Sequence, residues 1–136
     1  GRALESLSGG ERQRAWIAMA LAQQTEILLL DEPTTFLDLA HQLEILDLIA
    51  DLVRDRRKTV VAVLHDLNQA ARYADRMVLL RAGAIMSAGP PAQVMTAAAI
   101  AEVFGVAASI ISDPVTGTPM CVPAGRQGRK GGNGKG

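Results

Sequence analysis

Two short groups of residues could do chemistry in this sequence. Ser8-Gly9-Gly10-Glu11 matches a capping box and precedes a helix-favouring run. The free N–H groups of a helix start attract anions, and two glycines allow a phosphate to approach the backbone. Asp31-Glu32 directly follows the apolar run at residues 27–30. One carboxylate there could hold Mg²⁺ while its neighbour orients and deprotonates an attacking water.

The segments around the acidic pair predict a strand, a helix and a second strand. Residues 27–30 are uninterrupted apolar residues, which is typical of a strand buried on both faces. Apolar residues recur at helical spacing over 39–53, and residues 59–64 form a second apolar strand. Such a crossover makes the strands parallel, so Asp31-Glu32 and His65-Asp66 should lie at the same sheet edge. Open α/β sheets bind ligands at that edge.

The rest of the chain alternates short elements with turns. The pattern predicts a helix over 68–74, a hairpin of strands 77–80 and 84–87, a helix over 92–104, and short strands with turns over 110–122. His41 falls on the amphipathic helix, and we expect it at the surface. The predicted fold class is therefore α/β.

Composition excludes several classes of protein. The 136 residues are 49% hydrophobic with no net formal charge, as in ordinary soluble domains, and only 3% are aromatic, which disfavours a stacking surface for single-stranded nucleic acid. No apolar stretch reaches the roughly 20 residues that cross a bilayer, and no signal peptide is visible. One cysteine permits no internal disulfide, two histidines are too few for a convincing zinc site, and a reducing compartment is expected.

Taken alone, a capping box is an ordinary helix start, and an acidic pair after a strand is an ordinary loop start. Their order and spacing in this chain are far more specific. The segments are residues 7–11, residues 27–31, Phe36-Leu37-Asp38 and His65. In this order they resemble the signature, Walker B strand, D-loop and switch histidine of the ATP-binding subunit of an ABC transporter.

The resemblance implies ATP and Mg²⁺ as ligands and a role for each matched residue. Ser8, Gly9 and Gly10 would contact the γ-phosphate of a nucleotide held mainly by a second subunit. Glu11, which replaces the more usual glutamine, completes the implied nucleotide-binding set. Asp31 would attend Mg²⁺, and Glu32 would be the general base. His65 would contact the γ-phosphate, and Asp38 would act across the dimer interface. The implied catalytic set is therefore Glu32, His65 and Asp38.

Further segments resemble the importers of ferric siderophores, with haem and cobalamin importers close behind. They are residues 14–23, 34–42, 64–68, 103–105 and 113–119. The resemblance implies transmembrane permease subunits, a second ATPase subunit in a homodimer and, indirectly, a periplasmic or lipoprotein substrate-binding protein as partners. It also implies a peripheral location on the cytoplasmic face of the inner membrane, with no nucleic acid. Nothing in these residues selects a cargo.

Besides Glu11, the sequence departs from the family in two motifs: it has no P-loop, Gly-x₄-Gly-Lys-Ser/Thr, and no Q-loop before the signature. We therefore expect a fragment with a partial P-loop NTPase-type sheet, which binds Mg-ATP weakly or not at all by itself and exposes apolar sheet surface. Residues 1–88 would be the C-terminal half of an ABC ATPase domain. Residues 89–125 would form a C-terminal helix and short strands, and 126–136 a disordered tail rich in glycine and basic residues.

Two other functions remain open at this stage. An ABC-type ATPase of DNA repair or chromosome structure shares the signature and the acidic pair, but the expected long coiled coils have no heptad run here. A catalytically dead fragment without ATPase activity is the other alternative, and the missing P-loop is its main support.

Overall fold

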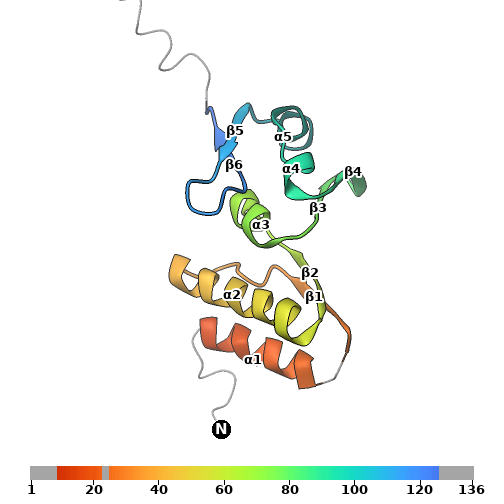
Figure 1. Ribbon diagram of the computed structural model, residues 1–136, viewed down its shortest axis with the longest axis vertical. Helices are drawn as coiled ribbons and strands as arrows, with labels where there is room; N and C mark the ends of the chain where they lie inside the picture. The colour runs from red at the N-terminus through yellow and green to blue at the C-terminus, as the bar shows by residue number, and fades with distance from the viewer. Residues whose placement is uncertain (1–8, 23–24, 126–136) are drawn as a thin grey trace, which may run out of the picture. The chain divides into compact units, whose positions relative to one another are not determined.

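A computed structural model describes residues 9–22 and 25–125 (Figure 1). Two compact units make up the chain, residues 1–65 and residues 66–136. The domain boundaries expected after residues 88 and 125 stay predictions, and the expected tail at 126–136 lies outside the described residues. In the described ranges, no helix is both long enough and apolar enough to cross a membrane.

The first unit contains two helices and two strands. They are α1 (Gly9–Ala22), β1 (Ile27–Asp31), α2 (Leu39–Arg56) and β2 (Thr59–Val63). Helices α1 and α2 lie side by side (Figure 1), and an ion pair joins Arg14 Nη1 to Glu44 Oε2 at 2.5 Å. Arg57, at φ 52°, ends α2 in the left-handed conformation.

Strands β1 and β2 pair in parallel, with Ile27 opposite Thr59 and Asp31 opposite Val63. The β-α-β crossover expected from the sequence is therefore confirmed. Because the two strands run the same way in this register, their carboxyl ends lie at one edge of the sheet.

The core of this unit lies on one face of the sheet. Its buried members are Ile17, Leu28, Ile45 and Leu52, drawn from α1, β1 and α2. Within the described residues the opposite face is exposed: Leu29 is 77% exposed, and Ile27, Val61 and Val63 are also exposed. The prediction that β1 is buried on both faces was wrong. Successive side chains of a strand point to opposite faces, and the described core packs only against the face that carries Leu28.

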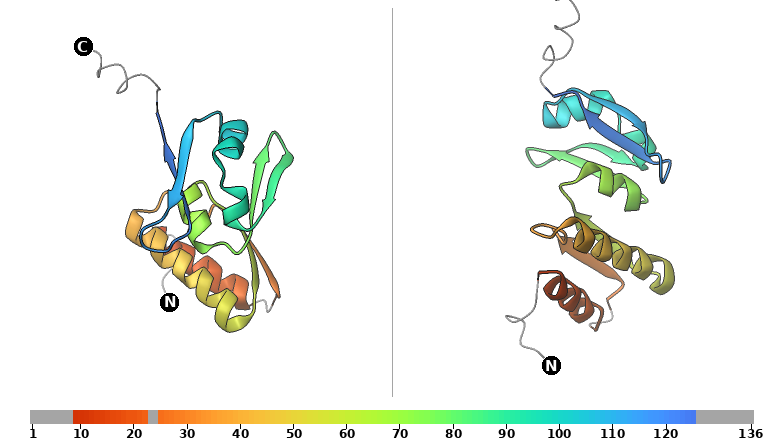
Figure 2. Two further views of the ribbon diagram at one scale, coloured as in Figure 1. Left: turned by 45° about the horizontal axis from the view of Figure 1, so that its top comes forward. Right: turned by 90° about the vertical axis from the view of Figure 1, so that its left-hand side faces the viewer.

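The second unit has two antiparallel hairpins with helices between them (Figure 2). Its elements are α3 (Leu67–Tyr73), β3 (Met77–Arg81), β4 (Ala84–Gly89), α4 (Pro91–Val94), α5 (Ala97–Phe104), β5 (Ala108–Ser112) and β6 (Pro119–Pro123). The single helix predicted over 92–104 was wrong. Thr96 interrupts it in an extended conformation and caps α5 by accepting a hydrogen bond from the Ala99 amide at 3.1 Å.

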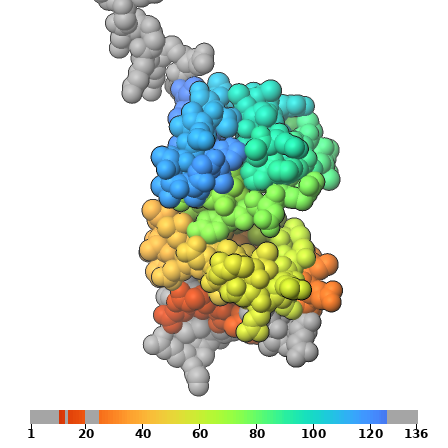
Figure 3. All heavy atoms as spheres, viewed as in Figure 1, coloured from red at the N-terminus to blue at the C-terminus, as the bar shows by residue number. Residues whose placement is uncertain are grey.

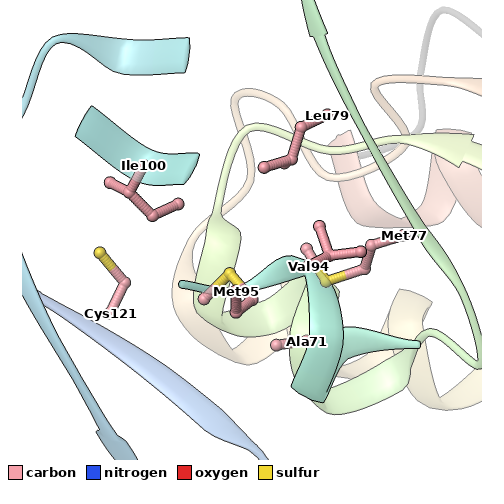
Figure 4. Packing of buried hydrophobic residues seen from close by; sticks show 7 residues of the cluster. All are labelled: Ala71, Met77, Leu79, Val94, Met95, Ile100 and Cys121. Carbon is pink, nitrogen blue, oxygen red and sulfur yellow. The ribbon is translucent and has the colours of Figure 1, made fainter. Parts of the chain in front are cut away.

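Seven residues form the core of the second unit (Figure 4): Ala71, Met77, Leu79, Val94, Met95, Ile100 and Cys121. Helix α5 packs on β5, and both reach the surface of this unit (Figure 3). Helix α3 is tied to β6 by the Asn68 amide, which accepts from the Cys121 N–H at 2.7 Å and donates to its carbonyl at 3.2 Å.

Candidate functional site

The predicted site residues of the first unit gather where β1 and β2 end. Asp31 is the last residue of β1. The backbone of the next residue still bonds to β2, since the Glu32 amide donates to the Val63 carbonyl at 3.1 Å. His65 lies two residues beyond the end of β2. The structure thus brings the acidic pair and the histidine to one edge, as the crossover predicted.

Glu32 and His65 are in direct contact. Glu32 Oε1 lies 2.5 Å from His65 Nε2. A carboxylate oxygen only accepts, so a hydrogen bond at this contact requires the tautomer of His65 that has its proton on Nε2. The Glu32 side chain is 40% exposed and that of His65 is 70% exposed, so water and a ligand can reach the pair. Such a pair can orient a water molecule and transfer its proton.

Glu32 has an unusual backbone conformation, with φ at 53° in the left-handed region. The turn that follows is held by hydrogen bonds from the Thr35 amide to the Glu32 carbonyl and from the Leu37 amide to the Thr34 carbonyl, both 3.3 Å. Thr34 within it is buried. Left-handed non-glycine residues persist only where surrounding structure holds them, and they concentrate at functional sites.

Asp31 fits the role of a magnesium ligand in its chemistry. Its carboxylate is exposed at the strand end, and Mg²⁺ prefers oxygen ligands, commonly one or two carboxylates together with substrate phosphates and water. In the part of the chain that the structure describes, no three histidine, cysteine, aspartate or glutamate side chains cluster as a metal site. A single carboxylate that shares its ion with phosphates needs no such cluster.

Asp38 caps α2. Its Oδ1 accepts from the His41 amide at 2.9 Å and also lies 2.7 Å from His41 Nδ1. Backbone hydrogen bonding from His41, and then bonding from its ring, lower the pKa of Asp38. Sequence reasoning placed His41 at the surface without a role. The spacing of three residues after a helix cap was the signal that could have revealed this contact.

The predicted phosphate-binding residues lie at the start of α1. Gly9 and Gly10 are its first two residues, and Glu11 is half-buried in its first turn, whereas Ser8 lies outside the described residues. The first N–H groups of a helix have no partner within the helix and are suited to an anion. The contacts that join Glu32 to His65 and Asp38 to His41 include no residue of α1. They therefore do not link the predicted phosphate-binding residues to the other predicted site residues.

Comparison with known proteins identifies the relatives of this chain. A family model described as ABC transporter matches residues 1–35. The ferric enterobactin transport ATP-binding protein FepC of Escherichia coli K12 is 54% identical over 125 residues, or 92% of this chain and 46% of that protein. The iron(3+)-hydroxamate import ATP-binding protein FhuC of Bacillus subtilis is 53% identical over 121 residues, which are 89% of this chain and 45% of that protein. The chain is homologous to ABC transporter ATP-binding subunits.

Solved structures agree with this homology to ABC transporter ATP-binding subunits. One is an inward-facing ABC transporter of metal-chelate type. The match covers 90% of this chain and 50% of the transporter chain, at 33% identity and a TM-score of 0.80. A dimeric post-hydrolysis structure of the ATP-binding cassette MJ0796 bound to ADP and Pi is also similar. The match covers 63% of this chain and 37% of the MJ0796 chain, at 40% identity and a TM-score of 0.56. The predicted α/β fold of an ABC ATPase is confirmed.

The chain spans about half the length of the curated relatives it matches. The names of these relatives, and of a cobalamin import ATP-binding protein of Halobacterium salinarum, agree with the siderophore and cobalamin importers that the sequence resembles.

Proposed function

We propose that these residues act in an ATP-binding subunit whose hydrolysis of ATP powers import of a ferric siderophore or a related metal chelate. The observation that carries the proposal is the contact between Glu32 and His65 at the carboxyl edge of β1 and β2. The names of the relatives support the import of a metal chelate.

In the proposed reaction, water attacks the γ-phosphorus of ATP, and the bond to the leaving ADP oxygen breaks. Glu32 orients that water and accepts its proton. The Nε2 proton of His65 holds Glu32 before the nucleotide arrives, and its exposed ring can then donate to a γ-phosphate oxygen. Asp31 would hold Mg²⁺, which neutralises charge on the phosphates as it develops. Phosphoryl transfer depends mainly on such positioning and electrostatic stabilisation.

The first helix supplies the other half of the proposed site. The N–H groups at Gly9 and Gly10, with Ser8, would bind the γ-phosphate of a nucleotide held by a second ATPase subunit, and Glu11 would complete the signature segment beside that nucleotide. Asp38 would act at the interface between the two subunits. The proposed assembly includes transmembrane permease subunits and, indirectly, a substrate-binding protein, with the ATPase peripheral on the cytoplasmic face of the inner membrane.

A chimeric protein, called the exchange protein below, tests this proposal because its P-loop comes from a relative. In it, the matched 125 residues of the E. coli ferric enterobactin protein are replaced by the corresponding residues of this chain. We expect the exchange protein to hydrolyse Mg-ATP and to restore ferric enterobactin uptake in a strain that lacks the E. coli protein. Glu32→Gln should abolish both activities and leave ATP binding intact.

Glu26→Gln is the matched control, because it makes the same chemical change just before β1 while the Glu26 carbonyl still accepts from the Thr59 amide at 2.9 Å. It should hydrolyse ATP at the rate of the parent. An exchange protein that is folded and binds ATP without hydrolysing it would refute the proposed ATPase and favour the catalytically dead alternative. Hydrolysis without uptake would refute the proposed import function and leave a non-transport ATPase.

A further inference from the structure

Asp38 and His41 make one interaction more than an ordinary helix cap needs. An ordinary N-cap aspartate accepts from backbone amides of the first turn. Here Oδ1 accepts from the His41 amide at 2.9 Å and is also 2.7 Å from Nδ1 of the same residue. Both interactions use one oxygen, so Oδ2 of this carboxylate, whose side chain is 68% exposed, is available to a further donor.

The contact also favours one tautomer of the histidine ring. The hydrogen bonds that lower the pKa of Asp38 keep it an ionised acceptor. Nδ1 must therefore carry a proton. In that tautomer the Nδ1–H of His41 donates to Oδ1 and restrains the Asp38 carboxylate.

The neighbouring residue on α2 restrains the backbone of the same loop. Gln42 Nε2 donates to the Leu37 carbonyl at 2.9 Å, and the Gln42 amide donates to the Asp38 carbonyl at 2.9 Å. Immediately before them, Phe36 is in the left-handed region at φ 66°. Successive residues of the first turn of α2 thus hold the peptide and the carboxylate at the end of a strained loop.

We propose that His41 is a positioning residue, which fixes the Asp38 carboxylate so that Oδ2 meets a donor from the second subunit during ATP hydrolysis. This inference rests on the proposed function, since Asp38 acts there at the subunit interface. His41 itself touches neither ATP nor the attacking water. Its effect passes through one hydrogen bond from Nδ1 to Oδ1.

Two substitutions in the exchange protein separate positioning from helix stability. His41→Asn places a side-chain N–H close to the position of Nδ1, whereas His41→Gln places its N–H further from the backbone. Glutamine is the better helix former of the two. A purely structural role therefore favours His41→Gln, and the positioning role favours His41→Asn.

We expect kcat of His41→Asn to stay within about threefold of the parent and kcat of His41→Gln to fall about tenfold, the usual effect of losing a hydrogen bond to a charged group. The KM for ATP should be unchanged in both. Equal kcat values, or the reverse order, would overturn the inference while hydrolysis by the parent still supports the proposed function.

The ring itself provides a readout that does not depend on activity. In ¹⁵N NMR spectra of the exchange protein, with the His41 signals assigned by their loss in His41→Asn, Nδ1 should be protonated. Asp38→Ala should remove this preference. A neutral ring with its proton on Nε2 in the parent would overturn the inference whether or not the protein hydrolyses ATP.

Discussion

Glu32 Oε1 lies 2.5 Å from His65 Nε2, although the two residues are 33 positions apart in the chain. Parallel pairing of β1 and β2 brings them together, since each follows the carboxyl end of its strand. A histidine at a strand end is ordinarily a structural residue. Here its proton is directed at the carboxylate proposed as the general base, which gives the ring a specific task.

Replacing His65 by alanine should slow ATP hydrolysis by the exchange protein on the order of 10²-fold, the usual loss when one preorganised donor is removed from a site where charge develops. His65 is 70% exposed in its side chain, so the free energy of unfolding should change little. Steady-state kcat and a urea titration measure the two effects. A kcat within twofold of the parent would remove His65 from the proposed mechanism.

The uncovered face of the β1/β2 sheet predicts opposite responses from adjacent leucines. Leu28 is 3% exposed and Leu29 is 77% exposed. In urea unfolding of the chain, Leu28→Ala should lower the free energy of unfolding by about 2–5 kcal/mol through lost burial and a cavity. Leu29→Ala should change it by no more than about 0.5 kcal/mol. Similar losses at both positions would show that something covers the second face.

Because Phe36 lies in a strained loop before α2, we expect glycine at this position not to lower the free energy of unfolding. Phe36 has φ at 66° and a fully exposed side chain, so Phe36→Gly relieves backbone strain and loses no burial. Its free energy of unfolding should equal that of the parent or exceed it by up to about 1 kcal/mol. Leu37→Gly is the matched control, because Leu37 packs against the core, and it should cost about 2 kcal/mol. Equal losses in both variants would contradict the strain.

Acid should weaken the second unit through one carboxylate. The Arg72 guanidinium, followed by the Val115 amide, holds the pKa of Asp113 well below its usual range. A depressed pKa in the folded state adds stability above the unfolded pKa of about 4, and this stability is lost as the pH falls below that value. Asp113→Asn should therefore lower Tm at pH 7, with the difference from the parent shrinking below pH 4. A difference in Tm independent of pH would refute this linkage.

The sequence was sufficient for those parts of the fold that depend on periodicity and strand direction. Apolar runs identified β1 and β2, helical spacing identified α2, and the crossover placed Asp31, Glu32 and His65 at one edge. Burial was harder to predict. The run Ile27-Leu28-Leu29 looks the same whether one face of a strand is covered or both are, so exposure of Leu29 could be found only from the packing.

Local hydrogen-bonding choices were the other limit. Thr96 lies within a helix-favouring stretch, and only the structure shows that its side chain caps α5 and divides the expected helix. His41 resembled a solvent-exposed helical residue, because amphipathic spacing does not reveal that its ring reaches back to Asp38. Both are single side-chain contacts, to which hydrophobic periodicity is insensitive.

The central claim, that Glu32 is the base in ATP hydrolysis, is tested most directly by single-turnover hydrolysis of prebound Mg-ATP in the exchange protein. Glu32→Gln should bind ATP as the parent does and slow this step at least on the order of 10²-fold, whereas Glu26→Gln should leave it unchanged. A Glu32→Gln protein that hydrolyses its bound ATP at the parental rate would contradict the account.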